Sequence, residues 1–549
     1  MSSLPSGENL EKPPVALQEL EQIYQQIQGN QFVTAVTSLM QLLVNDMHNP
    51  QLWLYIGLAY TRMSNWKPAI SALETALELN PQEVQAKHLL SLALFSTGEQ
   101  QKACDLIDSV TRKSKSGPQW MMRAYLHAHA SSDPMRALSV ARDWGRRFAD
   151  PLTRQARPLK VADRSPRKKL KVGYVTADFR EHSVAFFMQP VLAHHDHANF
   201  EVHVYSNGPV DGVTVHMHRL VPHWHDIQNL SDQDVYEQIR TQGIDVLVDL
   251  SGFTHGHRLG VFARRAAPVQ VTWLGYMQTL GMKAMDYRLV DLGNAPPSHA
   301  PYYSEALFHL HCMASYAPPV YAPLCEQPPM LRNGYPTLVS LNSSAKITDD
   351  MLRVWARILQ LREDAQLIIM VKEENADAAQ SHMQPRVEAA GMPLDRVSVL
   401  HQQPLNQFME MGHIADVALD TSPISGGTTT LHALWMGLPL VTLNAERGVD
   451  ASTARTLQGL GFGGEIAQSV DEYVQAALDL MADPERLQQH RLTAREKLRQ
   501  SVLMDYRART AELEKAYRLM WLNYLGGHRR HLNVDVDLDS LLADMDAAV

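Results

Sequence analysis

The sequence predicts an all-α N-terminal domain followed by two α/β domains. Residues 50–83 carry a helical-repeat pattern, and from residue 169 apolar, strand-like runs alternate with helical patterns. This alternation starts afresh at residue 336. Because one hydrophobic core rarely serves more than about 300 residues, a chain of 549 residues divides into several domains.

The helical repeat has the residue spacing of the tetratricopeptide motif, whose period is about 34 residues. Small residues at two positions let antiparallel helices approach each other, and weaker copies flank the central one. The concave face of such an array usually binds a protein or peptide, although a short array can also serve only as a packing platform. The central copy is defined by Trp53, Gly57, Tyr60, Ala69, Leu73, Ala76 and Pro81.

Both α/β segments have the pattern of a parallel sheet covered by helices, in which functional loops follow the carboxyl ends of strands. Long helices are expected to close the second segment, at 471–501 and 505–525. The predicted strands are 171–176, 200–205, 244–250, 269–274 and 287–290 in the first segment, and 337–341, 366–371, 397–400, 415–419 and 438–443 in the second.

These patterns divide the chain into six parts. A linker rich in Pro, Arg and Lys separates the helical domain from the first Rossmann-like domain, and the acidic tail is expected to be mobile. The parts are a disordered N-terminus (1–14), a tetratricopeptide-like domain (15–150), the linker (151–168), two Rossmann-like domains (169–330 and 331–527) and the tail (528–549).

Composition excludes several classes of function. The formal charge is −9 and no Lys/Arg run is longer than Arg167 to Lys169, so we expect no nucleic-acid partner. No apolar run approaches the ~18 residues of a membrane span, and the polar N-terminus does not resemble a signal peptide. Three scattered cysteines argue against a disulfide framework, so we expect a cytoplasmic protein.

We predict no metal site. The run from His194 to His197 cannot direct all its side chains at one ion, and the pair His255 and His257 is judged in the same way. The Asp-x-Asp sequence at Asp535 and Asp537 lies in the acidic tail, where solvated charge is the usual interpretation.

The stretch from Asp420 to Leu443 is the main candidate for an anion site. It follows an apolar strand and contains Gly426 and Gly427, then Thr428 to Thr430 at the start of a helix. Such a turn presents backbone N–H groups and hydroxyls to a phosphate. The alternative is an ordinary αβ turn with a threonine N-cap.

A second loop of the same domain supplies a candidate cation. Asn342, Ser343 and Lys346 directly follow the strand at 337–341, so this loop can converge with the glycine-rich turn. The alternative for Lys346 is a solvated lysine at a helix start. In the first α/β domain, Asp178 and His182 follow the first strand in the same way.

Two Rossmann-like domains that face each other across a cleft form the GT-B architecture of nucleotide-sugar glycosyltransferases. Residues from about 120 to 527 resemble the O-linked N-acetylglucosaminyltransferase (SPINDLY-like) family, glycosyltransferase family 41, of a bacterial type with a short tetratricopeptide array. The most specific matching blocks are APVQVTWLGY and ADVALDTSPISGGTTTLHALWMGLPLVTL.

The resemblance implies an inverting enzyme that needs no metal or other cofactor and moves a sugar, most often from UDP-GlcNAc, to Ser or Thr hydroxyls of proteins. It makes His182 the active-site histidine, with a general-base role considered, and Lys346 the group that stabilises the departing diphosphate. It makes Thr428 and Thr429 the phosphate-binding pair. The alternative for His182 is a structural cap of the following helix.

The resemblance also assigns further donor contacts and shows departures from the family. Asn342, Ser343, Gly426 and Gly427 belong to the donor site, and Phe408 takes the place of the residue that stacks on uracil. Asp178 and Thr279 are assigned to the acceptor and sugar side. Where many members have an acidic ribose ligand, this chain has His432, and further departures are Ser343, Leu405, Met411 and the pair Asp450–Ala451.

These departures leave the donor and acceptor open. UDP-glucose or GDP-fucose could replace UDP-GlcNAc, and Asn could replace Ser or Thr. An inactive scaffold that binds partners through its repeats is a more distant alternative. The expected partners are a nucleotide sugar and a protein or peptide bound in the repeat groove, and a homodimer is a further option.

Overall fold

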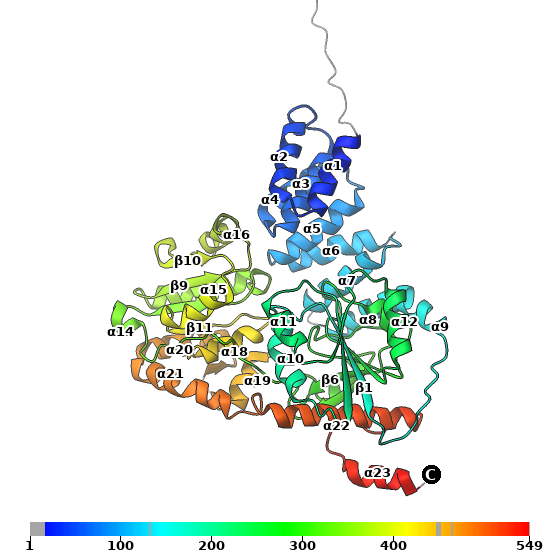
Figure 1. Cartoon of the computed structure of the whole chain (residues 1–549). Coiled ribbons are helices and arrows are strands. Elements are labelled where there is room, and N and C mark those ends of the chain that lie inside the picture. Colours follow the sequence, from blue (N-terminus) through cyan, green and yellow to red (C-terminus); the bar gives the residue numbers. More distant parts are fainter. Residues whose placement is uncertain (1–16, 113, 131–132, 446–451, 463–464, 548–549) are drawn as a thin grey trace, which may run out of the picture.

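The computed structural model describes residues 17–112, 114–130, 133–445, 452–462 and 465–547, so the predicted disordered segment 1–14 lies outside them. Figure 1 shows a helical array above two α/β domains that lie side by side. The predicted fold class, a tetratricopeptide-like array joined to two Rossmann-like domains, is confirmed.

The array consists of antiparallel helix pairs. Gly57 is required for the central pair, because a Cβ at this position would lie 2.5 Å from Leu73 Cγ. Ala69 and Ala76 are fully buried on the facing helix, so the small residues of the repeat pattern do bring the helices together. The helices are α1 (Leu17–Gln28), α2 (Phe32–Leu43), α3 (Pro50–Arg62), α4 (Trp66–Leu79), α5 (Val84–Ser96), α6 (Gln100–Thr111), α7 (Gly117–Ala130) and α8 (Pro134–Trp144).

The last helix pair, α7 and α8, belongs to the core of the first α/β domain as much as to the array. Trp120 and Trp144 are buried in one cluster with Tyr205 and Leu247 of the first sheet. The Trp144 ring packs edge to face on Phe253, with ring centroids 5.1 Å apart. The helices and the first sheet therefore share a hydrophobic core rather than meeting at a flexible joint.

The first α/β domain has one parallel seven-stranded sheet in the order β3-β2-β1-β4-β5-β6-β7. Its strands are β1 (Leu170–Thr176), β2 (Phe200–Ser206), β3 (His223–Asp226), β4 (Val246–Asp249), β5 (Val269–Thr272), β6 (Tyr287–Asp291) and β7 (Ala306–Leu310). Its helices are η1 (Gly145–Ala149), α9 (Asp150–Arg154), α10 (Ser183–His194), α11 (Gly212–His218), α12 (Asp232–Gln242), α13 (Leu259–Ala263) and η2 (Pro297–Tyr302).

The second domain has a parallel six-stranded sheet in the order β10-β9-β8-β11-β12-β13. Its strands are β8 (Thr337–Ser340), β9 (Gln366–Met370), β10 (Val397–Leu400), β11 (Val417–Leu419), β12 (Leu440–Leu443) and β13 (Ile466–Ala467). Its helices are α14 (Met330–Asn333), η3 (Ser344–Lys346), α15 (Asp349–Leu361), α16 (Ala376–Ala389), η4 (Leu394–Arg396), α17 (Leu405–Phe408), η5 (Met409–His413), α18 (Thr428–Trp435), α19 (Ser452–Gly459), α20 (Val470–Ala482) and α21 (Pro484–Arg499).

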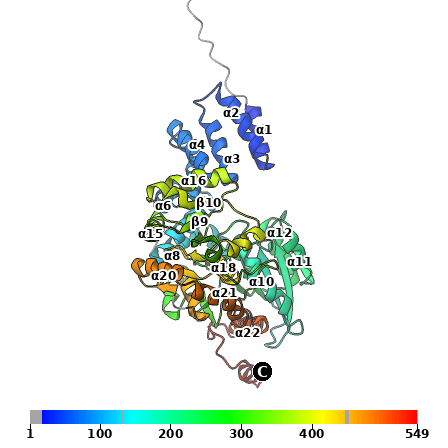
Figure 2. The ribbon, with the colours of Figure 1, turned by 90° about the vertical axis from the view of Figure 1, so that its left-hand side faces the viewer.

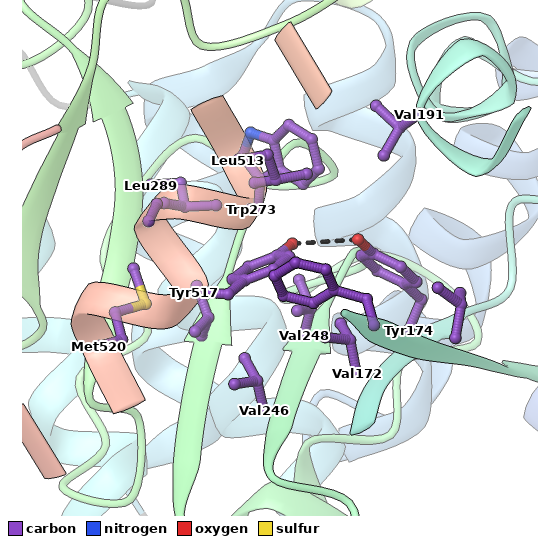
Figure 3. Close-up of a cluster of buried hydrophobic side chains, with 14 of the residues drawn as sticks. Val172, Tyr174, Val191, Val246, Val248, Trp273, Leu289, Leu513, Tyr517 and Met520 are labelled. Atoms are coloured by element: carbon purple, nitrogen blue, oxygen red, sulfur yellow. Dashed lines mark hydrogen bonds between the residues drawn. The ribbon is translucent and has the colours of Figure 1, made fainter. Parts of the chain in front are cut away.

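The long helix α22 (Tyr506–Leu525) corrects the predicted boundary of the second domain at residue 527. Figure 1 shows it running from the second domain along the base of the first. Its buried side chains, among them Leu513, Tyr517 and Met520, pack on the first sheet (Figure 3). The Tyr517 hydroxyl donates to the Tyr174 hydroxyl of β1 at 3.2 Å.

The segment after α22 also differs from the expected mobile tail. Val534 is only 3% exposed, and the backbone around it exchanges hydrogen bonds with His309 of β7. Helix α23 (Leu538–Ala547) follows, with Asp537 accepting a hydrogen bond from the Ser540 N–H at 3.2 Å. Apolar residues spaced between the acidic ones anchor this segment to the first domain. None of the described helices is long and apolar enough to cross a membrane.

Candidate active site

The glycine-rich turn of the second domain is held by the buried carboxylate of Asp420. This residue directly follows β11, and its Oδ1 accepts a hydrogen bond from the Gly426 N–H at 2.7 Å. Its Oδ2 accepts one from the Thr442 hydroxyl of β12, also at 2.7 Å. Asp420 is 1% exposed. The turn is therefore fixed to two neighbouring strands before any ligand binds.

Gly426 and Gly427 have different roles in this turn. A Cβ at Gly426 would lie 2.5 Å from Thr430 Oγ1, so the turn has no room for one. A Cβ at Gly427 would meet nothing within 4 Å, which means that the space beside its backbone is open. Gly427 is the N-cap of α18, and no side chain caps this helix. An open, uncapped helix N-terminus is a favourable place for an anion.

The threonines after Gly427 do not act as the helix cap that the alternative interpretation required. The Thr429 hydroxyl donates to Asn342 Oδ1 at 3.2 Å, which links the turn to the loop after β8. Asn342 Nδ2 in turn donates to Asp420 Oδ1 at 3.2 Å. Thr428 is the first residue of α18, beside the open face of Gly427. The two loops predicted to converge are thus joined directly.

Lys346 lies at this junction. Its ammonium group donates to the Ser425 carbonyl oxygen at 2.8 Å, and burial lowers the pKa of Lys346, with Asp420 opposing the shift. The side chain is therefore attached to the turn rather than free in solvent. Ser343 is the N-cap of the short helix η3, and its carbonyl oxygen accepts a hydrogen bond from the Lys346 N–H at 2.9 Å.

His432 and Phe408, both predicted donor residues, lie in one aromatic cluster between the domains. The His432 ring packs edge to face on Phe408 and on Phe186, with ring centroids 5.9 and 4.9 Å apart. Its Nδ1 lies 2.7 Å from the Tyr316 hydroxyl oxygen. Burial lowers the pKa of His432 to about 3, so the ring is neutral near pH 7.

In the first domain, Asp178 and His182 lie in the loop that joins β1 to α10. His182 Nδ1 lies 3.7 Å from Asp178 Oδ1, and the Arg180 guanidinium lies at the same distance from that oxygen. Burial, together with the charges of Arg180 and Lys372, lowers the pKa of His182 to about 4. Lys372 follows β9 of the second domain, so charge from both domains acts on this histidine.

His182 is also the N-cap of α10, as its structural alternative predicted. Its Nδ1 accepts a hydrogen bond from the Val184 N–H at 3.3 Å. A neutral imidazole that accepts through Nδ1 carries its proton on Nε2. In this arrangement Nε2 carries the proton and can donate a hydrogen bond. For Nε2 to act as a general base, the ring would first have to change to the tautomer with its proton on Nδ1.

Thr279 is held in a different group. It is 2% exposed, and its hydroxyl donates to Glu305 Oε2 at 2.8 Å and lies 3.0 Å from Ser304 Oγ. These bonds fix the loop after β5 to the start of β7. Among the described residues, no hydrogen bond links Thr279 to the loop of Asp178 and His182, with which it was grouped on the acceptor and sugar side.

The histidine runs considered in the sequence have structural partners. His195 Nδ1 lies 2.8 Å from Glu514 of α22, and His194 Nδ1 lies 2.8 Å from the Pro190 carbonyl oxygen. Burial lowers the pKa of His257 to about 4. The pair Asp450–Ala451 falls outside the described residues.

Within the described residues, Glu201, His203 and His223 at the sheet edge have ligand atoms within 4.8 Å of one another. The rings of His203 and His223 are stacked only 14° from parallel, so one ion cannot lie in both ring planes. Lys171 Nζ already lies 3.0 Å from Glu201 Oε1. This group is therefore better explained as a packed edge of the sheet.

Several residues of the site were not singled out in the sequence. Asp420 enters the prediction only as the first residue of the turn, and no sequence pattern points to Tyr316 or Lys372. A signal for Asp420 does exist, because Asp249 ends β4 of the first domain in the same way. Asp249 accepts hydrogen bonds from the Gly252 N–H at 3.0 Å and from the Thr272 hydroxyl at 2.9 Å. Both domains thus tie the turn after a central strand with a strand-end aspartate.

Comparison with known proteins agrees with this arrangement. The family described as Glycosyl transferase family 41 matches residues 153–314 and 337–513. A Solanum lycopersicum protein described as "Probable UDP-N-acetylglucosamine--peptide N-acetylglucosaminyltransferase SPINDLY" is 36% identical over 396 residues, which are 70% of this chain and 42% of that protein. An Oryza sativa subsp. japonica protein with the same description has the same identity and coverage.

A solved structure extends the likeness over the helical array. A mutant of the Thermobaculum terrenum O-GlcNAc transferase superposes with a TM-score of 0.81 at 30% sequence identity. The match covers 93% of this chain and 98% of that chain. The chain spans well under half the length of the curated plant relatives, but nearly the whole of this bacterial structure.

Proposed function

The chain belongs to glycosyl transferase family 41, and from this we propose that it moves N-acetylglucosamine from UDP-N-acetylglucosamine to Ser or Thr hydroxyls of a protein acceptor. Its similarity to the SPINDLY protein and to the bacterial O-GlcNAc transferase supports the choice of sugar and acceptor. The observation that carries the proposal is the junction of Lys346 with the open turn at Gly427. A lysine, the N-terminus of α18 and threonine hydroxyls belong to this one junction, and this supports the proposal of a diphosphate site.

In this reaction the acceptor oxygen forms a bond to the anomeric carbon while the bond from that carbon to the diphosphate breaks, and the proton of the acceptor hydroxyl passes to the departing diphosphate or to solvent. Negative charge grows on the departing diphosphate, so groups that bind it more strongly as the bond breaks accelerate the reaction. Lys346 supplies a positive charge, and the N-terminus of α18 supplies N–H donors and the positive end of its dipole. Attack from the side opposite the leaving group inverts the anomeric configuration.

These groups also support the proposal that no metal ion is needed. In many nucleotide-sugar reactions a divalent ion neutralises the diphosphate, and here Lys346 and the α18 N-terminus take that role. The carboxylate of Asp420, whose charge acts on Lys346, accepts hydrogen bonds from Gly426, Thr442 and Asn342 of the protein itself. Turnover that is undiminished by a chelator would support this part of the proposal.

His182 would act on the acceptor or sugar from the first domain. Because its pKa is about 4, it is neutral at physiological pH, and its Nδ1 is engaged by the Val184 N–H. We therefore assign it the role of a hydrogen-bond donor through Nε2 that orients the reacting groups. Asp178, on the same loop, holds Arg180 near the site.

His432 would replace the acidic ribose ligand of other family members. If the Tyr316 hydroxyl donates to His432 Nδ1, the proton of the neutral ring is on Nε2, which can donate to a ribose oxygen. Phe408 beside it offers an aromatic face for the uracil base. The site could then still bind a uridine nucleotide. The ribose would be contacted by a hydrogen-bond donor, His432 Nε2, in place of the hydrogen-bond-accepting carboxylate of other family members.

The acceptor is proposed to be a protein or peptide bound along the helical array, and the location cytoplasmic, where the three free cysteines would stay reduced. Intact-mass measurement of an acceptor-peptide library with UDP-GlcNAc, UDP-glucose and GDP-fucose tests the proposal. A mass gain of one N-acetylhexosamine on Ser or Thr supports it. A gain with another sugar only, or on Asn, would replace the donor or acceptor, and no nucleotide binding at all would favour the scaffold alternative.

A further inference from the structure

The loop that carries Lys346 is held from outside its own domain by the helical array. Gln100, the first residue of α6, donates from Nε2 to the Ala345 carbonyl oxygen at 3.3 Å. The two residues are 245 positions apart in the sequence. The residue immediately before Lys346 is therefore attached to a helix of the repeat domain.

Apolar packing supports this hydrogen bond. Ala345 packs against the hydrophobic core of the helical array, although it belongs to η3 of the second α/β domain. The turn between α5 and α6 also approaches closely, because a Cβ at Gly98 would lie 3.3 Å from the Ile347 carbonyl oxygen. Gly98 has a φ of +87°, which favours glycine as well.

A second anchor holds the other side of the lysine. Arg386 of α16 donates to the Ile347 carbonyl oxygen at 2.7 Å and forms an ion pair with Asp349 at the same distance. Its guanidinium group would be 3.2 Å from a Cβ at Gly98. Figure 2 shows α16 beside the array, and α16 contacts α4. Lys346 thus lies between two residues, Ala345 and Ile347, whose carbonyl groups are both fixed from other elements.

We propose that Gln100 and the α5–α6 turn of the helical array are positioning elements for Lys346, so that the array forms part of the machinery that binds the donor diphosphate. This inference rests on the proposed function, because it assumes that Lys346 faces the leaving diphosphate. The array would then have two roles. It would bind the acceptor along its concave face and hold the cation of the donor site at its end.

The physical argument is one of geometry. Lys346 has a long, flexible side chain, and a charge stabilises a transition state only when it is held in place before the reaction. η3 is a three-residue turn with little structure of its own. Fixing the backbone on both sides of the lysine limits the positions that its ammonium group can take, and Gln100 supplies one of these attachments.

The test compares Gln100→Ala with Gln101→Ala. Gln101 is the adjacent residue on α6, is exposed, and bonds only within its own helix to Asp105 at 2.9 Å, so it controls for changes in the helix itself. For each variant, kcat and the donor KM are measured together with the Kd values of UDP and uridine. Uridine lacks the phosphates, so the ratio of the two Kd values isolates the diphosphate contacts.

We expect Gln100→Ala to lower kcat and to shrink the UDP-to-uridine preference by about three- to tenfold, the effect of one hydrogen bond. The Kd of uridine and the melting temperature of Gln100→Ala should equal those of Gln101→Ala. Equal kcat and equal nucleotide preference in the two variants would overturn the inference. A wild-type protein that binds neither UDP nor a UDP-sugar would instead overturn the proposed function, and this outcome is distinguished before any variant is compared.

A second pair of variants keeps the inference testable if Gln100→Ala shifts the helix. Gly98→Ala places a methyl group against Ile347 and Arg386, whereas Gly391→Ala places one in open space at a similar φ of +75°. Both variants carry backbone strain, but only the first pushes on the lysine loop. A selective loss of diphosphate preference in Gly98→Ala supports the inference, and equal losses in both contradict it.

Discussion

The Tyr316 hydroxyl oxygen lies 2.7 Å from His432 Nδ1, and this contact joins the segment between the two α/β domains to α18, the helix that follows the glycine-rich turn. Phe186, four residues after His182, packs on the other side of the same imidazole. The two halves of the candidate site therefore meet at His432. The residue proposed to contact the ribose is therefore also part of the contact between the domains.

Lys346→Ala should lower turnover by about 100-fold or more with the fold intact, because it removes the charge that we propose faces the leaving group. The measurement is kcat with UDP-GlcNAc, alongside the melting temperature. Lys102→Ala is the control, since its side chain is 74% exposed on the helical array. Near-normal turnover in the Lys346 variant would refute the assignment of the cation.

The two glycines of the turn should separate stability from activity. Gly426→Ala forces a methyl group against Thr430 and should cost about 1–3 kcal/mol of unfolding free energy. Gly427→Ala has room for its methyl group, but that group fills the space proposed for the phosphate. It should leave the melting temperature unchanged and raise the Kd of UDP by about tenfold or more, equivalent to ~1.4 kcal/mol. Tight UDP binding by Gly427→Ala would place the phosphate elsewhere.

The pH profile should reflect a neutral His182. Its pKa of about 4 lies below the ordinary value of 6.5, because burial and the charges of Arg180 and Lys372 disfavour protonation. If His182 works as a neutral hydrogen-bond donor, protonation of this residue should not decrease kcat/KM as the pH falls through 6.5. The loss should begin only as the pH approaches about 4. An acid limb near pH 6.5 that disappears in His182→Gln would show that the histidine titrates normally and could serve as a base.

Buried His432 should make the protein less stable in acid. Its native pKa is about 3 and its unfolded value 6.5, so between these values the unfolded chain binds a proton that the native chain does not. Its contribution is complete above pH 6.5 and falls as the pH decreases toward about 3. At pH 5 the loss is about 2 kcal/mol, since each pKa unit corresponds to about 1.4 kcal/mol.

Denaturant unfolding at pH 7 and pH 5 checks this prediction. His432→Gln should reduce the difference in unfolding free energy between the two pH values by that amount, because glutamine cannot take up a proton. His197→Gln, at an exposed histidine, should leave the difference unchanged. Identical acid sensitivity in both variants would mean that His432 is protonated as easily in the native protein as in the unfolded one.

The sequence predicted the architecture well because its signals are periodic and local. Gly57 and Leu73 indicated the helix pair, and apolar runs ending in Asp178, Asn342 and Asp420 indicated strands followed by functional loops. The edge strands β3, β7 and β13 were missed. β3 is polar throughout, from His223 to Asp226, and β13 has only two residues. β7 does carry an apolar run, Ala306 to Leu310, so its sequence signal was overlooked. The convergence of Lys346, Asn342 and Thr429 followed from the rule that parallel strands end at one edge of a sheet.

Long-range packing could not be predicted in the same way. Nothing local in Gln100 or Ala345 indicates that they meet, because the contact depends on how the array docks on the second domain. The assignment of α22 to the first domain has the same origin. The sequence of α22 predicts a helix. Where that helix packs depends on the apolar face that β1, β4 and β5 form together in the folded sheet.

The return of α22 to the first domain means that two separate stretches of chain connect the α/β domains, one near Tyr316 and one near Tyr506. The Tyr506 hydroxyl donates to the Tyr316 carbonyl oxygen at 3.0 Å, so the two connections lie against each other. The two connections are therefore attached to each other where the chain passes between the domains. A displacement of one domain relative to the other would therefore have to move both connections together. Removing the residues from 506 onward would remove α22 and expose the core of the first domain, whose strands all lie before residue 311 in the sequence.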